Sequence, residues 1–176
     1  VFLANGNTAS IVGLNRIFVS KQFQDQPFLY EGAISVVFKN KKTLVKIVSI
    51  INKITKRTEL FGLCGIDFII DENQSIFVID INPRPTATFE LHEFQESLFA
   101  AHIKSFNGGP INYISYNHNF SKGYVIYYAK ENLLIPENLK WPSWVKDRPH
   151  DKQMILIKNP VCTIHAEGVS EQQVEN

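Results

Sequence analysis

The stretch from Gly65 to Thr88 constrains the fold of this chain more than any other. It contains two runs rich in β-branched and aromatic residues, Gly65–Asp71 and Ile76–Asn82. The residues between them, Glu72–Ser75, are polar and typical of a turn. This pattern predicts a β-hairpin.

The hairpin's register determines which side chains share a face. If Asp71 and Ile76 form the last pair before the turn, antiparallel pairing places Asp67 directly opposite Asp80. Because side chains alternate along a strand, one face is then wholly apolar. That face carries Ile66, Phe68, Ile70, Phe77, Ile79 and Ile81, with Phe68 opposite Ile79 and Ile70 opposite Phe77. The other face carries Asp67, Ile69, Asp71, Val78, Asp80 and Asn82. A shift of one residue would scatter the apolar set, which favours this register.

The acid-bearing face has the composition of a metal site. Two carboxylates placed opposite each other destabilise a strand pair by up to ~1 kcal/mol, and a divalent cation would offset this repulsion. Asp67, Asp80 and the amide oxygen of Asn82 are hard oxygen ligands, which suit Mg²⁺ or Mn²⁺. Arg84 offers a planar guanidinium group to phosphate. An ordinary hairpin with a solvated acidic face is the alternative, and the apolar residues on that face argue against it.

The motifs GIDF and IDINPRP, separated by a short turn, resemble the C-terminal half of the ATP-grasp ligases. The similarity is greatest to the predicted ATP-dependent carboligases related to biotin carboxylase, and it extends over nearly the whole chain. It implies that Asp67, Asp80 and Asn82 bind the Mg²⁺ (or Mn²⁺) ions of Mg-ATP. It also implies that Arg84 is a catalytic residue that faces the phosphates. The family usually has Glu where Asp80 stands.

This resemblance implies an ATP- and Mg²⁺-dependent ligase that joins a small-molecule carboxylate to an amine or similar nucleophile. ATP would phosphorylate the carboxylate, and the nucleophile would displace phosphate from the acyl phosphate. Two alternatives stay open: a non-catalytic ATP-grasp-like module for assembly or nucleotide binding, and a metal-dependent phosphotransferase. The carboxylate, the nucleophile and the pathway are not specified by the sequence.

Two helices are predicted. Lys41–Leu60 has apolar residues at helical spacing, namely Leu44, Ile47, Val48, Ile51 and Ile54. Its Lys and Arg residues mostly lie off this stripe and are expected to be solvated. A second helix is predicted from Thr88, as its N-cap, to about Ser105. Its apolar stripe includes Phe94, Leu98 and Ala101.

The remaining pattern predicts strands and an α+β fold class. Strands are expected at residues 1–4, 10–22, 28–38, 122–130, 153–158 and 161–166, and an irregular loop at 141–149. The sequence FNGGP at 106–110 is the best boundary. Residues 1–105 would form the ATP-grasp C-terminal subdomain, an antiparallel sheet with two helices. Residues 106–176 would form a small β-rich subdomain, and the N-terminal part of the enzyme would lie outside this chain.

Composition narrows the range of partners and compartments. The net charge is +1, from 18 Lys+Arg and 17 Asp+Glu, so nothing indicates binding to nucleic acid. An apolar run of about 18 residues is absent, so no membrane span is expected. Cys64 and Cys162 need not pair, and a cytoplasmic location is the default. The five histidines lack the spacing of metal ligands. A homo-oligomer is left open.

Overall fold

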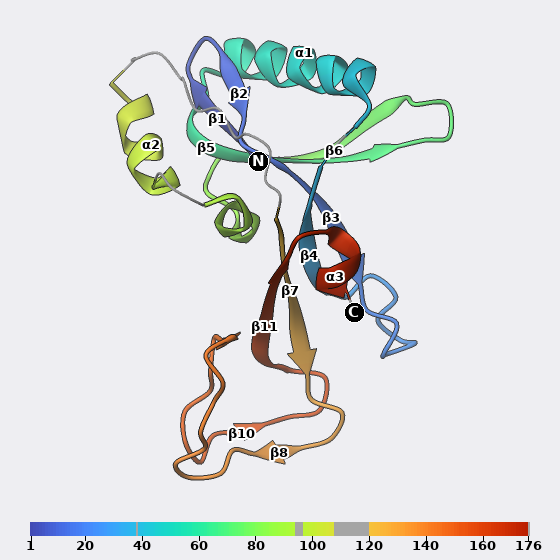
Figure 1. Cartoon of the computed structure of the whole chain (residues 1–176), viewed down its shortest axis with the longest axis vertical. Helices are drawn as coiled ribbons and strands as arrows, with labels where there is room; N and C mark the ends of the chain where they lie inside the picture. The colour runs from blue at the N-terminus through green and yellow to red at the C-terminus, as the bar shows by residue number, and fades with distance from the viewer. Residues whose placement is uncertain (38, 94–96, 108–119, 176) are drawn as a thin grey trace. The chain divides into compact units, whose positions relative to one another are not determined.

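The computed structural model describes residues 1–37, 39–93, 97–107 and 120–175 (Figure 1). The chain divides into two compact units. Unit 1 holds Val1–Asn15 and Val36–His118, and unit 2 holds Arg16–Ser35 and Asn119–Asn176. The segment 16–35, which the predicted limits 1–105 and 106–176 place in the first domain, therefore lies in unit 2. Those domain limits stay a prediction. Part of the predicted boundary loop, residues 108–110, lies outside the described residues.

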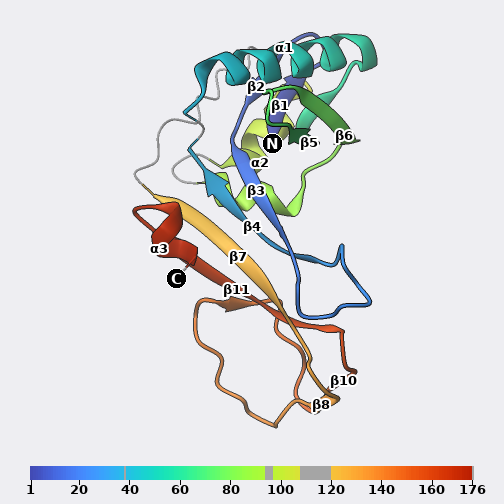
Figure 2. The same cartoon turned by 90° about the vertical axis from the view of Figure 1, so that its right-hand side faces the viewer.

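Unit 1 contains a four-stranded antiparallel sheet in the order β2-β1-β5-β6. The strands are β1 (Phe2–Asn5), β2 (Ala9–Ile11), β5 (Phe61–Ile70) and β6 (Ile76–Asn82). Helix α1 (Lys41–Thr58) lies along one face of this sheet (Figure 1, Figure 2). The contact is a buried apolar cluster of Phe2, Ala4, Ile47, Ile51 and Cys64. The predicted hairpin is therefore the edge of a sheet that α1 covers on one side.

The helix predicted at Lys41–Leu60 is confirmed, although the face it buries differs from the prediction. The side chain of Asn40 caps its first turn by accepting a hydrogen bond from the Thr43 N–H at 3.2 Å, and Glu59 ends it in the left-handed conformation. The buried residues are Thr43, Ile47, Ile51 and Thr55, whereas the predicted stripe member Val48 is exposed. Two threonines in the buried stripe lower its hydropathy, which is why neighbouring aliphatic residues dominated the sequence pattern.

The long strand predicted at Ser10–Gln22 is wrong because the chain breaks it in two. Strand β2 ends at Ile11, and β3 (Leu14–Val19) begins after a two-residue interruption. At the interruption the N–H groups of Val12 and Gly13 both donate to the Val1 carbonyl, at 3.0 and 3.3 Å. This turn of the backbone brings Gly13 beside the segment that follows β6, as described below.

The helix predicted from Thr88 to Ser105 is also interrupted. A 3₁₀ helix, η1 (Ala87–His92), comes first, and Glu93 then leaves the helical conformation. Helix α2 (Leu98–Ser105) starts anew, with the Ser97 side chain accepting a hydrogen bond from Ala100 N–H. The predicted N-cap, Thr88, lies inside η1, and the predicted stripe residue Phe94 lies outside the described residues. Ser97 is a second good capping residue, and it restarts the helix.

Unit 2 contains a five-stranded sheet in the order β3-β4-β7-β11-β9. Besides β3, its strands are β4 (Tyr30–Val36), β7 (Ser121–Tyr128), β9 (Val145–Lys146) and β11 (Pro160–Gly168). Strand β9 lies inside the predicted loop 141–149, so that part of the prediction is wrong. Its two residues pair with Thr163 and Ile164 of β11. A strand of two residues is too short to leave a periodic pattern in the sequence.

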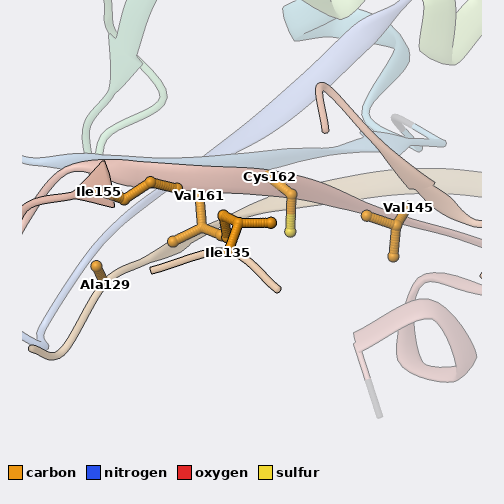
Figure 3. Close-up of a cluster of buried hydrophobic side chains, with 6 residues drawn as sticks. All are labelled: Ala129, Ile135, Val145, Ile155, Val161 and Cys162. Carbon is orange, nitrogen blue, oxygen red and sulfur yellow. The ribbon is translucent and has the colours of Figure 1, made fainter. Parts of the chain in front are cut away.

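Two short strands and a short helix complete unit 2. Strands β8 (Leu133–Leu134) and β10 (Met154–Ile155) pair with each other, and α3 is Glu171–Glu175. The strand predicted at 153–158 is thus reduced to two residues. The small core beneath them consists of Ala129, Ile135, Val145, Ile155, Val161 and Cys162 (Figure 3).

Candidate functional site

The structure confirms the pairing on which the predicted site depends. In the β5–β6 hairpin, Asp67 lies directly opposite Asp80, and Gly65 lies opposite Asn82. Because these positions share one face of the sheet, both carboxylates and the amide come together there. Asp67 and Asn82 are half-buried, and Asp80 is exposed.

The predicted register also holds at the base of the hairpin, where Ile66 lies opposite Ile81, but it is wrong beyond Asp67 because the hairpin contains a β-bulge. Phe68 pairs with Val78 instead of Ile79, Ile69 pairs with Phe77, and Ile70 pairs with Ile76. The turn takes residues 71–75 and is therefore one residue longer than expected. Without compensation this turn would set Asp67 opposite Ile79. The bulge between the Asp67 and Phe68 pairs leaves Ile79 as the extra residue and restores the opposition of the two aspartates.

The longer turn has a local cause in Asp71. Its N–H donates to the Ser75 carbonyl at 3.0 Å, and its Oδ1 accepts a hydrogen bond from the Ser75 N–H at 2.7 Å. Gln74 takes the left-handed conformation, with φ of 61°. Asp side chains commonly form turns in this way. Asp71 is thus the first residue of the turn and not the last residue of the strand.

The bulge changes which apolar residues share the face of the aspartates. Val78 was predicted on that face but pairs with Phe68, which packs on the α1 side of the sheet. Phe77 takes the place of Val78 and lies opposite Ile69. Ile69 and Phe77 are 59% and 55% exposed. The acid-bearing face therefore continues toward the turn as an exposed apolar surface.

Hydrogen bonds hold the second carboxylate and the amide in a defined arrangement. Asp80 Oδ1 accepts from the Ile81 N–H at 2.8 Å, and Asp80 Oδ2 accepts from Asn82 Nδ2 at 3.2 Å. The amide nitrogen of Asn82 is thereby turned to the carboxylate, which leaves the amide oxygen as a donor for a cation. Within the described residues, no group of three or more His, Cys, Asp or Glu side chains could hold a metal. The donor set here is two carboxylates with one amide oxygen, which suits a cation that takes its other ligands from phosphate and water.

The loop after β6 carries Arg84 on a tight turn. The Arg84 N–H donates to the Asn82 carbonyl at 2.8 Å, and Arg84 Nη1 donates to the Pro85 carbonyl at 3.2 Å. Thr86 then packs directly on Gly65, since a Cβ atom at Gly65 would lie only 2.5 Å from Thr86 Cγ2. The exposed Arg84 thus lies between two fixed points, the end of β6 and the Gly65–Thr86 contact.

Arg16 forms ion pairs with Glu171, at 3.6 Å, and with Glu175. Cys64 and Cys162 are both buried free cysteines, and burial raises the pKa of the Cys64 thiol to about 11. His118 lies outside the described residues. None of the described helices is long and apolar enough to cross a membrane.

Sequence reasoning missed the support that His92 gives to this region. His92 is buried, with 4% of its surface exposed, and its ring lies against Gly13. An isolated glycine after an apolar run was the only signal in the sequence. Such a glycine indicates a close approach without naming the partner.

Comparison with known proteins identifies relatives. The ATP-grasp domain family matches residues 1–88. The chain is 30% identical over 121 residues to the uncharacterized protein MJ0776 of Methanocaldococcus jannaschii. That alignment covers 69% of this chain and 30% of the relative, so the chain spans about a third of that protein's length.

Solved structures with the same fold include two enzymes. An L-amino acid ligase from Bacillus licheniformis matches with a TM-score of 0.68 and 12% identity, over 99% of this chain and 47% of that protein. The biotin carboxylase domain of Hydrogenobacter thermophilus 2-oxoglutarate carboxylase, in complex with MgADP, ADP and bicarbonate, matches with a TM-score of 0.67 and 11% identity. That match covers 93% of this chain and 39% of the other. The predicted α+β, ATP-grasp-like fold class is confirmed.

Proposed function

Because this chain belongs to the ATP-grasp family, we propose that it supplies the metal and phosphate site of an ATP-dependent ligase that joins a carboxylate to an amine or similar nucleophile. The observation that carries the proposal is the direct opposition of Asp67 and Asp80 beside Asn82. The bulge and the longer turn alter every pair nearer the tip of the hairpin, yet this opposition is kept. Unneutralised, it would destabilise the strand pair.

Each residue of the site has a distinct role in the proposed reaction. Asp67, Asp80 and the Asn82 amide oxygen would hold Mg²⁺, or Mn²⁺, with the phosphates of ATP. When bound, the ion would neutralise charge on the phosphate oxygens. Asp80 is oriented for this by its hydrogen bonds to Ile81 N–H and Asn82 Nδ2. Arg84 would stabilise negative charge on the phosphoryl group as it passes from ATP to the carboxylate.

The surface beside the acids favours a nucleotide over an inorganic anion alone. Ile69 and Phe77 continue the same face and are more than half exposed. The nucleobase of a nucleotide has apolar faces that could cover such side chains, while the phosphates of the same nucleotide would lie nearer the two aspartates. The biotin carboxylase domain named above was solved with MgADP. That complex contains a nucleotide and the metal that we propose here.

Mn²⁺ binding monitored by electron paramagnetic resonance, with and without a non-hydrolysable ATP analogue, tests this function. The longest form of the protein that carries residues 1–176 should be used. Asp67→Asn and Asp80→Asn should each weaken Mn²⁺–nucleotide binding by at least about tenfold, because each removes a charged ligand. Glu72→Gln is the matched control, since Glu72 is an exposed acid in the turn of the same hairpin. Asp80→Glu should retain binding.

Three results would redirect the proposal. Equal Mn²⁺–nucleotide affinity in wild type, Asp67→Asn and Asp80→Asn would overturn the metal site. Nucleotide binding without any turnover, over a panel of carboxylates and amines, would favour the non-catalytic module. ADP release that needs no carboxylate would favour the phosphotransferase.

A further inference from the structure

The buried histidine of η1 contacts two residues at the start of β3. A Cβ atom on Gly13 would lie 2.2 Å from both Cε1 and Nδ1 of His92, so the ring occupies the space that a side chain at Gly13 would need. His92 Nε2 lies 2.9 Å from Asn15 Oδ1. Because that oxygen can only accept, His92 donates this hydrogen bond through Nε2. The contacts join residues nearly eighty positions apart in the chain.

These contacts fix the far end of the segment that carries Arg84. The loop is fixed first where Thr86 packs on Gly65. The chain then enters η1, where the Phe89 N–H donates to the Thr86 carbonyl at 3.0 Å. His92 is the last residue of η1 and is almost fully buried. One continuous short segment therefore links the Arg84 loop to the His92 contacts.

We propose that His92 is a positioning residue for the Arg84 loop: by packing on Gly13 and donating to Asn15, it holds η1, and through η1 the loop, beside the two aspartates. The inference rests on the proposed phosphate-binding role of Arg84. His92 itself does not touch the phosphate. Its effect is to limit the movement of a loop in which Arg84 makes local hydrogen bonds, to the carbonyl groups of Asn82 and Pro85.

His102 provides a matched control within the same unit. Its ring also lies against a glycine, since a Cβ atom on Gly62 would be 2.3 Å from His102 Nδ1. Its Nδ1 accepts a hydrogen bond from the Leu63 N–H at 2.9 Å. His102 thus holds α2 against β5, as His92 holds η1 against the start of β3. Loss of either ring should lower stability, but only loss of His92 should release the Arg84 loop.

Hydrogen–deuterium exchange and nucleotide affinity together test the proposal. In His92→Ala, residues 83–91 should exchange faster than in wild type, while α1 is unchanged. The affinity for Mn²⁺ with ADP should fall by about tenfold to a hundredfold, the cost of misplacing a positioned group by about 1 Å. His92→Gln should restore both the slow exchange at residues 83–91 and the affinity, since the amide of the glutamine side chain can donate to Asn15. His102→Ala should leave exchange at 83–91 and the affinity unchanged.

The outcomes separate this inference from the proposed function. Unchanged exchange at 83–91 in His92→Ala, or an equal increase in His102→Ala, overturns the positioning role whether or not nucleotide binds. Failure of His92→Gln to restore what His92→Ala loses overturns the donor role. If His92→Ala does not fold, Asn15→Ala removes the acceptor and gives the same comparison. Absence of Mn²⁺–ADP binding in wild type overturns the proposed function, and the exchange result then decides the inference alone.

Discussion

Replacing Gly65 by Ala should disturb the site through one identifiable atom. The new Cβ would lie 2.5 Å from Thr86 Cγ2 and 3.4 Å from Asn82 Cβ. Carbon atoms pack at about 3.5–4.0 Å, so the Thr86 methyl group has to move by about 1 Å. The strand conformation of Gly65 is open to any residue, so the cost comes from this contact and not from backbone strain.

The size of the expected loss of stability follows from overpacking. Extra methyl groups in well-packed sites typically cost about 1–3 kcal/mol, and we expect the free energy of unfolding of Gly65→Ala to fall by this amount. A shift of about 1 Å in Thr86 should carry Arg84 with it and weaken Mn²⁺–nucleotide binding by about tenfold or more. Urea denaturation followed by circular dichroism measures the first effect, and electron paramagnetic resonance of Mn²⁺ measures the second.

Thr86→Ser supplies the decisive second mutation. It removes the Cγ2 methyl group and keeps the hydroxyl that lies 3.1 Å from Thr88 Oγ1. In the Thr86→Ser background, Gly65→Ala should cost little, so the double-mutant cycle should show a coupling energy of about 1–2 kcal/mol. A cost for Gly65→Ala that is the same in both backgrounds would refute the reasoning, because the contact would then not be its source.

Two further predictions concern the core and helix α1. Because burial raises the pKa of Cys64 from 9.0 to about 11, the unfolded thiol loses its proton first, and the free energy of unfolding should fall as the pH rises from 9 to about 11. Urea denaturation at several pH values should show a shallower fall in Cys64→Ala, and identical slopes would contradict the assignment. Glu59→Gly should raise the melting temperature, since Glu59 ends α1 with φ of 52° and glycine adopts that conformation without a penalty of about 1 kcal/mol. Glu72→Gly, at another exposed acid, is a control that should not stabilise the protein.

The sequence predicted the chemistry of the hairpin better than its geometry. The opposed pair Asp67–Asp80 could be inferred because two acids, an amide and the flanking apolar residues all favour one register near the base of the hairpin. The length of the turn could not be inferred in the same way. Asp71 can serve as a strand residue or as a turn former, and only the structure shows its carboxylate on the Ser75 N–H. That one-residue difference moved Phe77 to the acid-bearing face and Val78 away from it.

Breaks within a predicted strand or helix were harder to predict than the strands and helices themselves. The break before Gly13 and the break after His92 both replaced a single predicted element with two. In each case the local pattern is compatible with continuation, and a contact between distant segments decides otherwise. The histidine ring on Gly13 stabilises both interruptions at once, because the start of β3 and the end of η1 must each turn to form it. The pattern of a single sequence reflects local conformational preference and does not reveal a contact between distant segments.

The same distinction separates the residues of the site into two kinds. Asp67, Asp80, Asn82 and Arg84 are polar residues on one hairpin and its loop, and the sequence indicated them as a candidate site through their spacing and the family resemblance. Gly65 and Gly13 matter for what they lack, because each leaves room for a side chain from the segment 86–92. Substitutions at the proposed metal ligands should therefore weaken Mn²⁺–nucleotide binding with little loss of stability. Substitutions at the glycines should reduce both together, and at Gly65 the Thr86→Ser mutation, which removes the facing methyl group, should restore both.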